Sequence, residues 1–151
     1  MRVHLTLLAG VFAFATSNVM LSAQAKPAAP ADQHEAGEHH HPEAAAVKNP
    51  VKSTPESIAA GKKLYDMQCA TCHGATGKGD GKMAASIPDP KPSDLTDATW
   101  KHGSTDGEIF TLIGNGAKGT AMRGYASRMK PEDIWNMVNY IRTLSPKSAT
   151  R

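Results

Sequence analysis

The chain has 151 residues, enough for one ordinary domain together with a leader or a tail. Of these residues 40% are hydrophobic but only 5% are aromatic, so the side chains supply modest apolar surface and a large buried cofactor would add to it. The formal net charge is +3, and the lysines are spread among acidic residues. Because a nucleic-acid-binding surface needs a dense basic stripe, we expect no nucleic-acid partner.

Residues 1–25 have the parts of a secretory signal peptide. A positive start at Arg2 precedes an apolar run from Leu5 to Ala15, and Ala23-Gln24-Ala25 is a small-x-small cleavage site. The apolar run is shorter than the roughly 20 residues that a membrane span needs, which argues against an uncleaved anchor. We therefore predict cleavage near Ala25, a bacterial periplasmic or secreted product, and no transmembrane segment after cleavage.

Residues 26–52 are rich in Ala, Pro, Glu and His and contain almost no large apolar side chains. Such a segment buries too little surface to offset its ordering entropy, so a disordered linker is predicted. Histidines concentrate between His34 and His41, and His-rich tracts can bind transition metals. We expect this tract to act mainly as a solvated spacer, with at most weak binding of zinc, nickel or copper.

Residues 53–147 are predicted to form the folded domain, and residues 148–151 a short tail. Capping residues and apolar side chains at helical spacing predict three helices, from Pro55 to about Gln68 or Cys69, from Asp106 to about Asn115, and from Pro131 to Leu144. A helical turn is compatible with residues 82–86, whereas the prolines of residues 88–92 exclude a regular helix. No stretch alternates apolar and polar residues, so the predicted fold class is all-α with long structured loops.

Cys69-Ala70-Thr71-Cys72-His73 has the spacing that attaches a c-type haem covalently. At the end of a helix, this spacing can place two thiols along one porphyrin edge and bring His73 under the iron as an axial ligand. A zinc site would need four ligands, and only His102 remains outside the leader, the linker and the motif. A redox dithiol expects a βαβ context, and a disulfide across so short a loop would stabilise little.

The second axial ligand of such a haem is expected to be a methionine or a histidine. Met122 follows the glycine-rich turn 116–119, and a loop ligand can reach over the open face of the haem. Met129 is the runner-up. The other candidates are weaker because of their position: Met67, Met83, His102 and Met137. A closed sixth position favours electron transfer over gas binding or peroxide chemistry.

An ordered set of short motifs extends over nearly all of the predicted domain. It comprises Gly61 and Tyr65, Cys69-x-x-Cys72-His73-Gly74, Gly77-Lys78-Gly79-Asp80-Gly81, Pro92-Ser93-Asp94-Leu95-Thr96, Gly114-Asn115-Gly116, Gly119-Thr120-Ala121-Met122, and Ile134-Trp135 with Val138, Tyr140, Ile141, Arg142 and Leu144. With this set the chain resembles a class I c-type cytochrome, in the monohaem bacterial group similar to the haem domains of cbb3-type oxidase subunits. The resemblance implies a cytochrome c fold, with three to five helices packed around one covalent haem c.

The resemblance also implies roles for particular residues. Met122 becomes the distal ligand, and a carbonyl in the stretch 88–92 is expected to accept the ring N–H of His73. Trp100 is expected near a haem propionate or in the core. An arginine, Arg123, follows Met122 where many relatives have a proline, which predicts a more mobile loop.

Two further residues implied by the resemblance, Gly61 and Tyr65, are expected to cross the last helix near Val138 and Tyr140.

The predicted function is one-electron transfer between a redox protein donor and a redox protein acceptor, without catalysis. The alternative is a haem-relay subunit of an oxidase, dehydrogenase or reductase complex. A haem enzyme or sensor with an open distal site is a third hypothesis. Scattered basic residues could form a weak docking ring or simply keep the surface soluble: Lys62, Lys63, Lys78, Lys82, Lys101, Lys118, Arg123 and Lys130.

Overall fold

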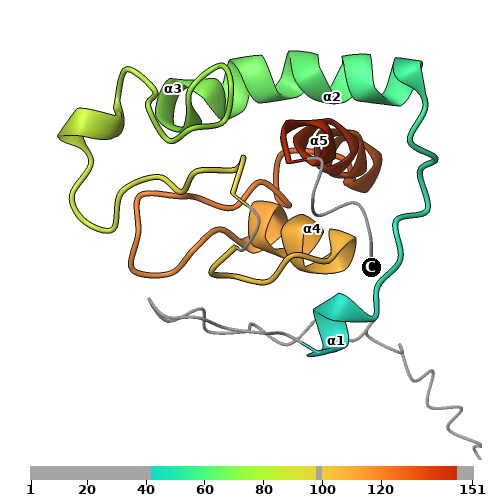
Figure 1. Cartoon of the computed structure of the whole chain (residues 1–151). Helices are drawn as coiled ribbons and strands as arrows, with labels where there is room; N and C mark the ends of the chain where they lie inside the picture. Colours follow the sequence, from blue (N-terminus) through green and yellow to red (C-terminus); the bar gives the residue numbers. More distant parts are fainter. Residues whose placement is uncertain (1–41, 98–99, 146–151) are drawn as a thin grey trace, which may run out of the picture. The chain divides into compact units, whose positions relative to one another are not determined.

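The computed structural model describes residues 42–97 and 100–145, all of which belong to one compact unit. The predicted leader, the His34–His41 tract and the predicted tail at 148–151 lie outside the described residues. Within them the elements are α1 (Pro42–Ala45), α2 (Pro55–Gln68), α3 (Ala70–His73), the 3-10 turn η1 (Ala84–Ser86), α4 (Asp106–Asn115) and α5 (Pro131–Leu144) (Figure 1). No described residue lies in a β-strand, which confirms the all-α fold class.

The three predicted long helices are confirmed, and side-chain caps explain where α2 and α4 begin. The Thr54 side chain accepts a hydrogen bond from the backbone N–H of Ser57, and Pro55 opens α2. Thr105 and Glu108 form a reciprocal capping box at the start of α4. No helix within residues 42–97 and 100–145 combines the length and the apolar character that crossing a membrane requires.

The close crossing of α2 over α5 organises the core. A Cβ added to Gly61 would lie only 1.9 Å from the carbonyl oxygen of Asn136, so the backbones of the two helices approach without a side chain between them. One turn further along α2, the rings of Tyr65 and Tyr140 meet with centroids 5.1 Å apart. The predicted crossing of Gly61 and Tyr65 with the last helix is confirmed, with Gly61 opposite Asn136 rather than Val138.

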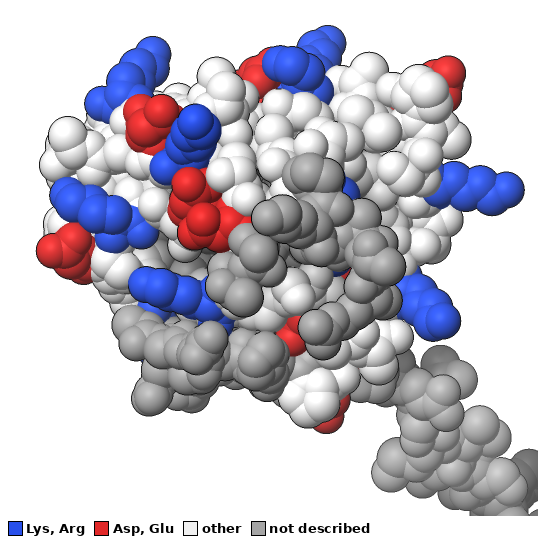
Figure 2. Space-filling view, viewed as in Figure 1, with Lys and Arg blue, Asp and Glu red and all other residues white. Residues whose placement is uncertain are grey.

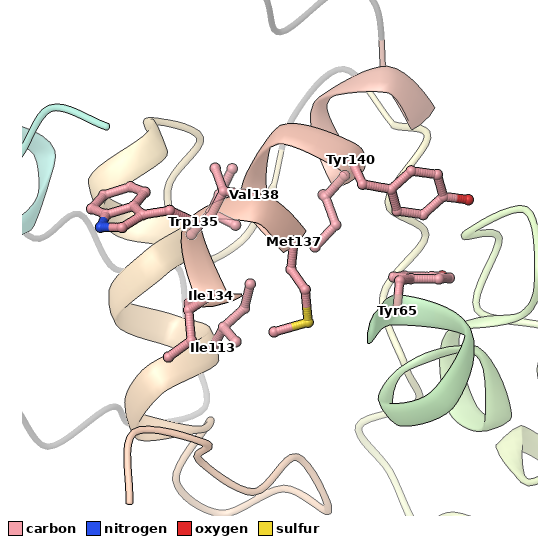
Figure 3. Packing of buried hydrophobic residues seen from close by; sticks show 9 residues of the cluster. Tyr65, Ile113, Ile134, Trp135, Met137, Val138 and Tyr140 are labelled. Atoms are coloured by element: carbon pink, nitrogen blue, oxygen red, sulfur yellow. The ribbon is translucent and has the colours of Figure 1, made fainter. Parts of the chain in front are cut away.

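The opposite face of α5 packs on α4, so α5 lies between α2 and α4 (Figure 1). Ile113 of α4 gathers with Ile134 and Met137 of α5 between these two helices (Figure 3). The Phe110 and Trp135 rings stack with centroids 4.0 Å apart. The core therefore spans three helices.

The structure differs from the predicted linker at residues 42–52, which pack against the domain. Ala44 of α1 is buried, and the backbone carbonyls of Ala44 and Val47 lie against Gly107 of α4. The composition assigned this stretch to a disordered linker that ends at residue 52. Its contacts include the small side chain of Ala44, backbone carbonyls and a single core-packed valine, Val51. Such contacts add little to a count of large apolar residues.

A buried amide of α5 fastens the same segment. Asn139 is only 3% exposed, and its Oδ1 accepts a hydrogen bond of 2.8 Å from Nδ2 of Asn49. Its Nδ2 donates to Ser57 Oγ of α2 at 2.7 Å and to the Val51 carbonyl at 3.2 Å. One side chain thus satisfies polar groups of the N-terminal segment and of α2, which is the arrangement that a buried amide requires.

Candidate functional site

The cysteine motif occupies a helical turn of its own. Cys69 is the C-cap of α2, its N–H donating to the Tyr65 carbonyl at 2.8 Å, and α3 starts directly after it. The N–H groups of Cys72 and His73 both donate back to the Cys69 carbonyl, at 3.1 and 2.9 Å. This turn brings the two thiols, which are not joined in a disulfide, and the His73 imidazole to one cavity.

The glycine-rich loop that follows completes the hydrogen bonding of α3. The last carbonyls of a helix have no partner within the helix. Here the N–H of Gly79 donates to the His73 carbonyl at 2.8 Å, the N–H of Gly81 to Cys72 at 3.1 Å, and the N–H of Met83 to Thr71 at 3.0 Å. Residues 79–83 therefore hold the turn of residues 69–73, the predicted attachment turn, in place.

The His73 ring is oriented by a backbone carbonyl. Its Nδ1 lies 3.0 Å from the carbonyl oxygen of Ser93, and donation from Nδ1 leaves the lone pair of Nε2 available to a metal. The predicted acceptor within 88–92 is wrong by one residue, because the carbonyl beside the His73 ring is that of Ser93. Burial lowers the pKa of His73 and outweighs the opposing effect of the Ser93 hydrogen bond, which favours the neutral, ligating imidazole.

A cavity of about 860 Å³ adjoins the motif. Its lining includes Cys69, Cys72, His73 and Met122, and its walls are largely aliphatic, with Leu95, Ile109, Leu112, Ile113 and Ile141. Burial, with a smaller contribution from the neighbouring Cys72, raises the pKa of the Cys69 thiol to about 12. A volume of this size, apolar walls, two thiols and a neutral imidazole suit a flat, largely apolar group that carries a metal, such as a haem.

Met122 is held on this cavity by a tight turn at the end of α4. Its carbonyl accepts the N–H of Ala117 at 3.0 Å, and its own N–H donates to Oγ1 of Thr120 at 3.0 Å. An isolated antiparallel bridge pairs Gly116 with Arg123. These backbone contacts hold the turn in the structure, and the greater mobility expected from Arg123 in place of proline stays a prediction.

Among the other candidates for the distal ligand, only His102 lines the cavity. Of the methionines that the structure describes, only Met122 lines the cavity. Met129 packs against the core, Met137 is fully buried in α5, and the remaining two point to solvent, Met67 being 55% and Met83 47% exposed.

Arg142 stabilises the side of the cavity that carries Trp100, through contacts that the sequence did not predict. Trp100 lines the cavity, and the guanidinium of Arg142 lies 5.8 Å from the centroid of its ring. The same guanidinium forms an ion pair of 2.6 Å with Asp106 and donates to the Ser104 carbonyl at 2.6 Å. Arg142 therefore ties the segment before α4 to α5. The sequence contained no local signal for it, because the partners are more than 30 residues away.

Tyrosine hydroxyls hold the chain on both sides of the cysteine motif. Tyr125 donates to the Gln68 carbonyl at 3.0 Å, and Tyr65 donates to the Gly74 carbonyl at 2.8 Å. Burial is the largest cause of the raised pKa of Tyr65, so its hydroxyl remains a donor through the neutral range. Sequence reasoning placed Tyr65 at the helix crossing and assigned no role to Tyr125.

Comparison with known proteins gives consistent results. The profile of the Cytochrome c family matches residues 58–145. The chain is 34% identical over 91 residues to the cbb3-type cytochrome c oxidase subunit CcoP of Rubrivivax gelatinosus, a match that covers 60% of this chain but only 27% of that protein. It is 35% identical over 92 residues to cytochrome c-554(547) of Halothiobacillus neapolitanus, covering 57% of this chain and 94% of the other.

A solved structure agrees with these sequence relatives. The Kuenenia stuttgartiensis reducing HAO-like protein complex Kustc0457/Kustc0458 contains a chain similar to this one, with a TM-score of 0.61 and 30% sequence identity. The similarity covers 67% of this chain and 48% of that one.

Proposed function

The chain belongs to the cytochrome c family, and on that premise we propose that it is a periplasmic electron carrier with His73 and Met122 as axial ligands. Family membership implies a covalently bound haem c, whose iron supplies reversible one-electron chemistry when it is bound. The observation that carries the ligand assignment is that one cavity is lined by the Cys69 and Cys72 thiols, the His73 imidazole and the Met122 thioether. The predicted leader at residues 1–25 supports the periplasmic location.

Each of these residues has a distinct task in the proposal. Cys69 and Cys72 form the two thioether bonds, on a turn whose carbonyls accept hydrogen bonds from the following loop. His73 offers Nε2 to the iron while Ser93 restrains the ring. Met122 closes the sixth position with a soft thioether, which favours ferrous iron and raises the reduction potential relative to a second histidine.

Replacing Met122 by alanine tests the ligand assignment, with Met129→Ala as the matched control. We expect the ferric Met122→Ala protein to lose the long-wavelength Met–iron charge-transfer band, to bind added cyanide or carbon monoxide readily, and to have a lower reduction potential. Met129→Ala should keep the band, because Met129 lies outside the cavity lining. A band that survives Met122→Ala, or that disappears in Met129→Ala, would contradict the assignment.

Basic residues outnumber acidic ones at the cavity lining, which favours weak binding of an acidic redox partner. Lys91, Lys101, Arg123 and Arg128 are among the lining residues, with Asp97 as the acidic one. Figure 2 shows lysine and arginine side chains interspersed with acidic ones over the visible face, without a continuous basic surface. Such a distribution supports brief, salt-sensitive docking and argues against nucleic-acid binding.

The second candidate function is a haem relay within a larger redox complex, and similarity to the oxidase subunit CcoP favours it. Electron exchange rates distinguish the two roles. A freely diffusing carrier should be reduced and oxidised at rates that rise linearly with its concentration when mixed with membranes of its source. A relay subunit should instead co-purify with its partner and show turnover that added free protein does not increase.

A further inference from the structure

The cavity has two sides that are far apart in the sequence. One side carries the attachment turn at the end of α2. The other side carries residues 116–123 after α4, which we call the Met122 turn. A methionine ligand must compete with water and other small ligands for the iron, so the distance between the two sides has to be held. The hydrogen bond from Tyr125 to Gln68 joins them across 57 residues of sequence.

Hydrogen bonds hold Tyr125 at both of its ends, at its backbone N–H and at its hydroxyl. Tyr125 follows the Met122 turn in the chain. Its backbone N–H donates to the carbonyl of Ile113 in α4 at 3.0 Å. The Arg128 guanidinium lies 4.7 Å from the centroid of its ring and donates to the Gly124 carbonyl at 3.2 Å. The hydroxyl reaches the last residue of α2, directly before Cys69.

We propose that Tyr125 is a positioning residue for Met122, because its hydroxyl fastens the Met122 turn to the carbonyl of Gln68 beside the attachment site. This role rests on the proposed ligation by Met122. Tyr125 need not touch the iron or the thioether. It acts by holding the turn against α2, so that the Met122 thioether stays within reach of the iron when another ligand competes for it.

The test uses the holoprotein with Tyr125→Phe, which removes the hydroxyl and keeps the ring. Imidazole is the probe, since its binding to ferric iron requires Met122 to leave. The imidazole affinity should rise about fivefold, the factor that corresponds to the loss of one neutral hydrogen bond. The Met–iron band should weaken and the reduction potential should fall. Tyr140→Phe is the control, because Tyr140 packs on Tyr65 in the core and does not line the cavity.

A double-mutant cycle separates action through Met122 from a general opening of the cavity. In a Met122→Ala background, Tyr125→Phe should leave the imidazole affinity unchanged. An unchanged affinity in the single Tyr125→Phe variant overturns the proposal, and so does an equal rise in the Met122→Ala background. If Met122→Ala alone leaves both the band and the imidazole affinity unchanged, the ligand assignment fails and the role of Tyr125 falls with it.

Discussion

Replacement of Cys69 and Cys72 together by serine is expected to give a protein that loses all of its haem in acidified organic solvent, whereas the wild-type protein keeps its pigment. Serine has a similar size but forms no thioether, so only the axial bonds and the cavity walls would retain the group. Each single replacement leaves one thiol of the attachment turn and should retain part of the covalent pigment. The measurement is the haem spectrum of the protein and solvent fractions after extraction.

Intact mass spectrometry provides a second reading of the same experiment. The wild-type mass should equal that of the chain after cleavage near Ala25 plus one haem, and the double variant should show the polypeptide mass alone. The double variant should also unfold at a lower temperature, because a group bound only in the folded state stabilises it and a cavity of about 860 Å³ loses its tethered contents. Pigment that stays with the double variant would show that these cysteines are not the attachment points.

Gly61→Ala is expected to destabilise the domain by about 3 kcal/mol or more, because the added methyl group overlaps the Asn136 carbonyl of α5. To make room for the methyl group, α2 and α5 would have to move apart, and core residues of both helices pack at this contact. Since the obstacle is backbone, a side-chain movement cannot relieve it. Denaturant unfolding of the holoprotein, followed by far-ultraviolet circular dichroism, measures the loss.

Gly114→Ala is the matched control for that substitution. Gly114 also lies in a helix, but its added Cβ would meet only the Ala126 side chain, at 3.7 Å. Its expected effect is a small stabilisation of about 0.5 kcal/mol, since alanine restricts the unfolded chain more than glycine does. A Gly61→Ala protein as stable as the wild type would show that the α2–α5 contact can open without cost.

Helix boundaries were predictable because their causes lie within a few residues. Thr54 and Pro55 start α2 through a side-chain cap and a fixed backbone angle, and Pro131 starts α5 through its fixed backbone angle without a side-chain cap. The attachment turn was equally recognisable, since thiol spacing and the adjacent histidine are local. Met122 lines the cavity and Met129 does not, and the choice of Met122 as the ligand stays a prediction.

The sequence did not predict the contacts between segments that are distant along the chain. The choice of Ser93 as partner of His73 depends on which carbonyl of an irregular loop faces the ring, and the Pro92 carbonyl faces Gly79 instead. The packing of residues 42–52 on the domain includes hydrogen bonds to buried Asn139, a polar residue in the middle of α5. No spacing rule reports such pairings, because the partners meet only after the helices have packed.

The sequence by itself thus determined the chemistry that the attachment turn can perform and the helices that carry it, because spacing, caps and apolar periodicity act over one or two turns. Only the tertiary structure decided which methionine shares a cavity with His73, how closely α2 can approach α5, and that Tyr125 joins the two sides of that cavity. Those outcomes depend on the relative placement of segments tens of residues apart, which packing and hydrogen bonding select together.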